Sequence, residues 1–205
     1  MRLPFTAGQF FAVFGQYNEA VWPAQILLNA LALLCVAAVV WPRPWTDRFV
    51  SAVLAFLWAW LAVAYHLWFF ARINPLAYGF AAVSALGAGL FFWFGVVRSR
   101  MRFSLQRRSR ALTGAGLVVY ALIVYPLLSI LAGHRYPETP TFGLPCPTTI
   151  FTIGMLALMT APRPRSVFIV PILWCVVGLQ AAFLLGVPQD LALAAAALAG
   201  LWLMR

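Results

Sequence analysis

Long apolar runs, separated by short connections that carry arginine, limit what this chain can fold into. The runs begin near Trp22 and recur to the end of the 205 residues. The chain is 64% hydrophobic and only 9% charged, with a mean hydropathy of +0.93. A soluble domain is about half apolar and about a quarter charged. We therefore expect lipid to surround most of this chain.

The runs predict an all-α fold, a polytopic transmembrane helical bundle with seven spans in one domain over residues 1–205. A membrane-spanning helix needs about 20 mostly apolar residues. The segment 148–162 is shorter and would cover only about 22 Å. Six spans, with this segment re-entrant, are therefore the alternative. The predicted spans are 22–42, 49–71, 75–97, 111–132, 148–162, 166–186 and 188–204.

A short amphipathic helix is expected ahead of the first span, over residues 4–21. Apolar side chains recur at helical spacing, while Gln9 and Glu19 fall on another face. Thr6 and Gln9 have the spacing of a capping box at the start of a helix. This segment is predicted to lie at the membrane interface and to turn into the bilayer at Trp22 and Pro23.

The placement of arginine predicts the orientation. All 14 basic residues are arginine, and with seven spans eleven of them fall on one side and three on the other. Positive charge favours the cytoplasmic side. We therefore expect a multi-pass protein of the bacterial inner membrane with its N-terminus outside and its C-terminus in the cytoplasm. The absence of lysine excludes a retinal Schiff base.

The segment from Arg98 to Arg110 holds six arginines in thirteen residues. Only Phe103 is interleaved with them as an aromatic residue, and no nucleic-acid-binding motif surrounds them. Contact with anionic lipid head groups is the favoured interpretation. No nucleic acid is expected as a partner.

Polar residues are concentrated in the half of the molecule predicted to face outward. Ionisable groups at membrane depth are costly, so those retained usually pair or serve a site. The sequence therefore predicts an outer pocket walled by the N-terminal helix, the ends of the second and fourth spans, and the segment at Cys146. Its candidate ligand-binding residues are Glu19, Gln25, His66, His134, Glu138, Cys146, Thr148 and Thr149.

Cys146 precedes Pro147, a residue suited to the first turn of a helix. A helix N-terminus favours a thiolate or a bound anion, and Thr148 and Thr149 add hydroxyls. The alternative is that Cys146 is an unreactive cysteine at a capped helix start, and we favour this interpretation. Gln25 lies four residues before Asn29 on one helix face, where such pairs more often join helices than bind ligands.

His66 and His134 would lie at similar depth, and together with Cys146 they could hold zinc, copper or haem iron. Nothing in the sequence shows that the three meet. Histidines that hydrogen-bond to a neighbour are the more common case, so the cofactor remains unknown.

Three hypotheses for function follow. The leading one is a protein that binds or transports a small solute or metal ion in an outer-face pocket. The alternatives are a haem- or metal-dependent membrane oxidoreductase or transferase, and a non-catalytic assembly or interaction protein. The nucleotide-binding, hydrolase and metalloprotease motifs are absent. No catalytic residue is assigned, and an enzyme is not favoured.

Several segments resemble a bacterial family of small multi-pass membrane proteins of unknown function. The most specific of them is the Cys-Pro-Thr-Thr segment that begins at Cys146. The resemblance implies a class of protein and no mechanism. The remaining segments are Leu3-Pro-Phe-Thr, Gln9-Phe10, Tyr17-Asn18, Val21-Trp22-Pro23-Ala-Gln25, His66 through Asn74-Pro75, Phe142-Gly143, and Pro145 through Thr152.

Overall fold

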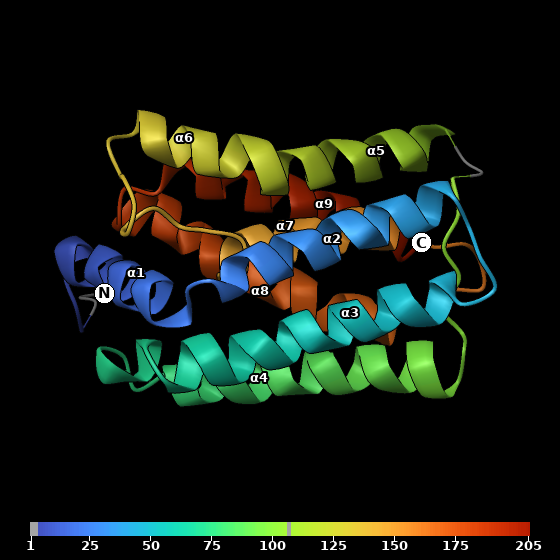
Figure 1. The fold of residues 1–205 in the computed structure, drawn as a ribbon, viewed down its shortest axis with the longest axis horizontal. Helices are drawn as coiled ribbons and strands as arrows, with labels where there is room; N and C mark the ends of the chain where they lie inside the picture. Colours follow the sequence, from blue (N-terminus) through green and yellow to red (C-terminus); the bar gives the residue numbers. More distant parts are fainter. Residues whose placement is uncertain (1–3, 106–107) are drawn as a thin grey trace.

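A computed structural model describes residues 4–105 and 108–205. Within these ranges the fold is all-α, with two isolated β-bridges and no strand. Most of the helices run along the long axis of the molecule and form one bundle (Figure 1).

The helices follow one another with short connections. Three of the long helices contain π-helical turns (η1, η3 and η4) that continue the same rod. In chain order the elements are α1 (Ala7–Val21), α2 (Ala24–Val40), α3 (Thr46–Trp60), η1 (Leu61–Leu67), η2 (Phe70–Arg72), α4 (Ala77–Phe91), η3 (Phe92–Val97), α5 (Arg108–Val119), η4 (Tyr120–Val124), α6 (Tyr125–Leu131), α7 (Pro145–Ala157), α8 (Ser166–Leu184), η5 (Pro188–Leu191) and α9 (Ala192–Leu203).

The predicted count of seven spans is not supported. Among the described residues four helices are long and apolar enough to cross a membrane, or up to five if one bent pair forms a single span. The four are Thr46–Arg72, Ala77–Val97, Arg108–Leu131 and Ser166–Leu184.

The other three predicted spans are short helices. The bent pair consists of α1 and α2, which meet at 88°. The segment predicted at 148–162 is α7, with only 13 residues, and that at 188–204 is the short apolar helix Pro188–Leu203. Hydropathy counts apolar residues whether they face lipid or protein, so short helices packed inside the bundle resemble spans in the sequence.

The N-terminal helix α1 has the predicted start. The Gln9 amide donates to Thr6 Oγ1 at 3.2 Å, and the Thr6 amide donates to Gln9 Oε1 at 2.8 Å. The capping box is therefore confirmed. The apolar face of α1, with Phe10 and Phe14, is buried, whereas Gln9 and Glu19 are exposed.

Helix α7 lies inside the bundle, between its neighbours α5, α8 and α9 (Figure 1). Every residue of α7 except Cys146 is buried. A helix that is buried on all sides lies in the interior of the bundle, and this explains why α7 needs no span length. A methyl group on Gly154 would lie 3.1 Å from the Gly114 carbonyl oxygen, so these glycines allow α5 and α7 to pack closely.

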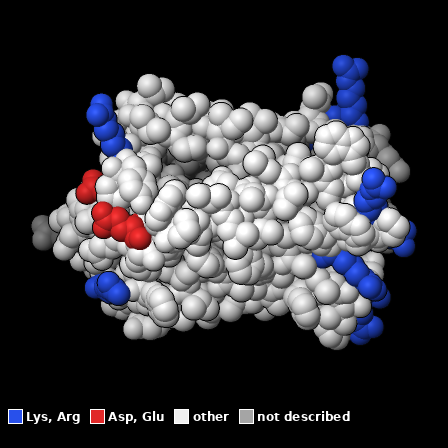
Figure 2. Space-filling view, in the orientation of Figure 1, with Lys and Arg blue, Asp and Glu red and all other residues white. Residues whose placement is uncertain are grey.

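Charge is distributed between the two ends of the bundle (Figure 2). The α2–α3 and α4–α5 connections, the segment after α7 and the C-terminal residue lie at one end, which carries most of the described arginines. Glu19 and Glu138 lie at the other end, with Arg72 and Arg135. Two arginines that entered the orientation count, Arg2 and Arg107, lie outside the described residues.

Candidate functional site

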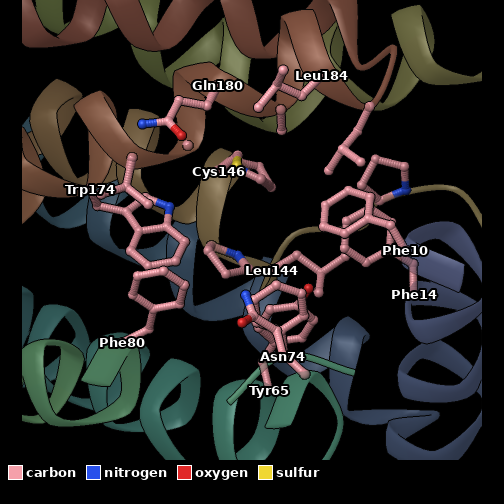
Figure 3. Close-up of a pocket in the computed structure, with 18 of the residues that line it drawn as sticks. Phe10, Phe14, Tyr65, Asn74, Phe80, Leu144, Cys146, Trp174, Gln180 and Leu184 are labelled. Atoms are coloured by element: carbon pink, nitrogen blue, oxygen red, sulfur yellow. The ribbon is translucent and has the colours of Figure 1, made fainter. Parts of the chain in front are cut away.

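A cavity of about 190 Å³ lies where α1, the end of the α3–η2 rod, the start of α7 and the second half of α8 meet. The N-terminal helix, the end of the second predicted span, Tyr125 of the fourth and Cys146 border it as expected, whereas the walls from α8 and from Phe80 of α4 were not predicted. Its chemistry differs from the expected polar pocket, because most of the lining side chains are apolar or aromatic. Figure 3 shows Phe10 and Phe14 facing Trp174 and Phe80 across this space.

Side chains of α1, η2, α4 and α8 supply the aromatic walls. Phe10 and Phe14 come from α1, and Phe10 packs against Phe70 of η2 with ring centroids 6.2 Å apart. Phe80 of α4 meets the Trp174 ring of α8 edge to face at 5.2 Å. Aromatic walls with a few polar groups are typical of sites for small organic ligands.

The remaining α1 contacts hold the wall in place. The Tyr17 hydroxyl donates to the Gly143 carbonyl oxygen at 3.1 Å and accepts from Trp60 Nε1 at 2.7 Å. Asn18 Nδ2 donates to the carbonyl oxygens of Pro137 and Thr139 at 2.6 and 2.8 Å. Helix α1 is therefore fastened both to α3 and to the loop that precedes α7.

Cys146 lies at the polar end of the cavity, with Asp190 behind it. Cys146 lines the cavity in the first turn of α7, and its thiol interacts with the carboxyl group of Asp190. Asp190 is 1% exposed and accepts a hydrogen bond from the Tyr125 hydroxyl at 2.5 Å. Tyr125 is itself a lining residue, so the carboxyl group lies directly behind the wall.

The protonation of these two groups follows from their burial. Both lie outside the four span-length helices. Burial raises the pKa of the Asp190 carboxyl to about 7, and hydrogen bonds from Tyr125 and Cys146 oppose that rise. Burial and the neighbouring Asp190 raise the pKa of the Cys146 thiol well above its usual value. This favours the unreactive thiol over the thiolate that the helix start suggested.

Trp174 brings a polar atom to the same end of the cavity. A methyl group on Gly178 would lie 2.8 Å from Leu193 Cδ1, 3.3 Å from Cys146 Sγ and 3.4 Å from Trp174 Nε1, so the sulfur and the indole nitrogen lie near each other at a tightly packed point. Trp174 is 7% exposed, and its Nε1 has no hydrogen-bond partner among the residues that the structure describes. An unpaired buried donor is costly.

The two predicted histidines lie apart in different surroundings. His66 is fully buried in η1, with its ring 4.9 Å from the Trp174 ring, and neither ring nitrogen has a partner in the described part of the chain. His134 is half-buried and stacks on Phe11 at 3.8 Å. Neither histidine lines the cavity.

The other predicted ligand-binding residues also lie away from the cavity lining. Glu19 and Glu138 are exposed. Gln25 donates from Nε2 to the Asn18 carbonyl oxygen at 2.7 Å, so it joins the ends of α1 and α2. Thr148 and Thr149 are buried in the first half of α7.

The metal hypothesis required His66, His134 and Cys146 to converge. Within residues 4–105 and 108–205 there is no group of three or more histidine, cysteine or acidic side chains placed to hold a metal ion. Cys146 meets Asp190 and Trp174, whereas His134 meets Phe11.

At the polar end of this site, sequence reasoning assigned Cys146 and missed Asp190, Tyr125 and Trp174. Asp190 carried a usable signal, because an acidic residue beside an apolar run is costly and needs a partner. Tyr125 and Trp174 carried none, since each lies within an apolar stretch where an aromatic residue is ordinary core.

In the described residues, the fold and the cavity define an all-helical protein with four span-length apolar helices and a partly open aromatic site at one end. A family model described as a family of unknown function, DUF6064, matches residues 7–205, and the chain belongs to that family. No curated protein and no solved structure matches the chain.

Proposed function

We propose that this is an inner-membrane protein that binds a small, largely apolar molecule in the cavity between α1, α7 and α8. The observation that carries the proposal is the cavity itself, with aromatic walls and Cys146 at its polar end. Small-molecule sites combine such walls with a few placed polar groups. The proposal replaces the polar solute expected from the sequence with an apolar one and includes no metal.

The membrane setting supports this choice of ligand. Exposed large apolar side chains cover the outside of the bundle, including Leu33, Phe92 and Leu198. We place the arginine-rich end in the cytoplasm, against anionic head groups, because positive charge favours that side. The cavity then lies toward the outer side, where a ligand dissolved in the bilayer or arriving from outside can reach it.

The test introduces a phenylalanine side chain at one wall of the cavity, so that the side chain occupies the space for the ligand. Ala181 lines the cavity, whereas Ala182 does not, although both are half-buried on α8. The probe is α-methylstyrene, an uncharged aromatic hydrocarbon, and the readout is its effect on the melting temperature of the protein in detergent. A ligand that binds only the folded state raises this temperature.

We expect α-methylstyrene to raise the melting temperature of the wild type and of Ala182→Phe, but not that of Ala181→Phe. The Ala182→Phe variant controls for the added ring and for the effect of the probe on the micelle. Equal rises in all three proteins would show that the cavity does not bind the probe, and the proposal would be wrong.

A further inference from the structure

The walls of the cavity restrict the size and polarity of its occupant, and its polar end restricts the chemistry further. Three observations bear on that end. They are the unpaired donor of Trp174, the carboxyl group of Asp190 behind the wall, and the absence of arginine from the described lining residues.

Trp174 Nε1 can only donate a hydrogen bond. Trp174 lines the cavity, and its indole nitrogen lies near Cys146 Sγ beside Gly178. The indole N–H interacts with the Cys146 sulfur and opposes the rise in the pKa of the thiol, but among the described residues no acceptor meets full hydrogen-bond geometry with it. An occupant with an acceptor atom at this place would satisfy the donor.

The acceptor is not expected to carry a negative charge. Asp190 lies behind Tyr125 and Cys146, so an anionic occupant would be desolvated without a counter-ion and would repel the ionised form of that carboxyl group. The described lining residues include no arginine that could supply one. An uncharged oxygen, as in a ketone or another carbonyl compound, meets both conditions.

We propose that the ligand of this cavity is an uncharged aromatic or apolar carbonyl compound whose oxygen accepts a hydrogen bond from Trp174 Nε1–H. This proposal rests on the proposed function. The aromatic walls, with Phe10, Phe14 and Phe80, enclose its apolar part. Trp174 therefore determines which molecules bind, whereas the walls provide most of the contact area.

Three probes of nearly the same shape separate these contributions. Acetophenone carries a carbonyl oxygen, α-methylstyrene carries a methylene group in its place, and benzoate carries a carboxylate. Apparent affinities come from the rise in melting temperature with probe concentration. The rise in Ala181→Phe is subtracted as the contribution of the micelle.

In the wild type we expect acetophenone to bind about fivefold more tightly than α-methylstyrene, the difference that corresponds to one net hydrogen bond. Benzoate should produce no cavity-dependent shift. In Trp174→Phe, which keeps a ring in the wall, the acetophenone preference should disappear while α-methylstyrene still binds. Trp68→Phe, at an exposed position outside the cavity, should keep the preference.

The two proposals fail in different ways. If α-methylstyrene binds in the cavity but acetophenone binds no better, or benzoate binds as well as acetophenone, the carbonyl proposal is wrong and the proposed function stands. If Trp174→Phe keeps the preference, the donor is misassigned and the carbonyl proposal is again wrong. If no probe produces a shift that Ala181→Phe abolishes, the proposed function itself is wrong.

Discussion

Tyr125 donates its hydroxyl proton to the Asp190 carboxyl across 2.5 Å, and each side chain is only 1% exposed. The bond joins α6 to the η5 turn before α9, two elements separated by α7 and α8 in the chain. Cys146 contacts the same carboxyl group from the start of α7. One buried acid thus connects three elements around the polar end of the cavity.

Removing the Tyr125 hydroxyl should destabilise the protein. In Tyr125→Phe the carboxyl group loses its closest donor and remains buried, which costs about 1–3 kcal/mol. The measurement is the melting temperature in detergent. Tyr78→Phe is the control, because Tyr78 is 64% exposed. Equal stability of Tyr125→Phe and the control would contradict the assigned role.

Stability should depend on pH through Asp190. Burial raises the pKa of this carboxyl from 3.8 to about 7, so between these values the folded protein binds a proton that the unfolded chain releases. The stabilising contribution of protonated Asp190 is therefore fully present below pH 3.8, and it is lost as the pH rises through about 7.

The melting temperature of the wild type should therefore fall, relative to that of Asp190→Asn, as the pH rises from about 5 to about 8. The asparagine keeps an oxygen to accept from Tyr125 but does not titrate in this range. Parallel pH profiles of the two proteins would show that Asp190 does not titrate as stated.

Gly143 should not tolerate a side chain. Its φ is +101°, a backbone region that L residues rarely adopt, and a methyl group there would collide with Leu28 and approach the Tyr17 hydroxyl. Gly143→Ala is expected to lower stability by more than about 1 kcal/mol. Gly116→Ala, inside α5 with open space around it, is the control and should be neutral or stabilising. Similar stabilities of the two variants would argue against the strained turn.

The proposed orientation can be tested with two single cysteines in a background that lacks the three native ones. Glu138→Cys places the thiol at the acidic end, and Ser109→Cys places it at the arginine-rich end, both at exposed positions. A membrane-impermeant maleimide added to intact cells should label only the first. Labelling of only Ser109→Cys would show that the protein has the opposite orientation to the proposed one.

The sequence predicted the N-terminal helix well, because its signals are local. The Thr6 and Gln9 capping box and the buried face with Phe10 and Phe14 both appear in the structure. Part of the cavity wall was also anticipated, since α1, the ends of two long rods and Cys146 border it, but the contribution of α8 was not.

The span count and the chemistry of the site could not be obtained in the same way. A run such as 148–162 has the same hydropathy whether lipid or protein surrounds it, and only the packing of α7 distinguishes the two. The polar end depends on contacts between distant residues, such as Tyr125 with Asp190. Spacing along the chain contains no information about these contacts.

Helix α7 begins at the cavity with Cys146 and ends beside the arginine-rich loops. There the Leu158 carbonyl oxygen accepts from the Ser104 amide at 2.9 Å, and the Thr160 amide donates to the Arg102 carbonyl oxygen at 2.7 Å. Helix α7, which packs against α5, α8 and α9, thus runs from the cavity to the arginine-rich end of the bundle. The cavity and the arginine-rich end are therefore joined by protein contacts inside the bundle, through the buried residues of α7.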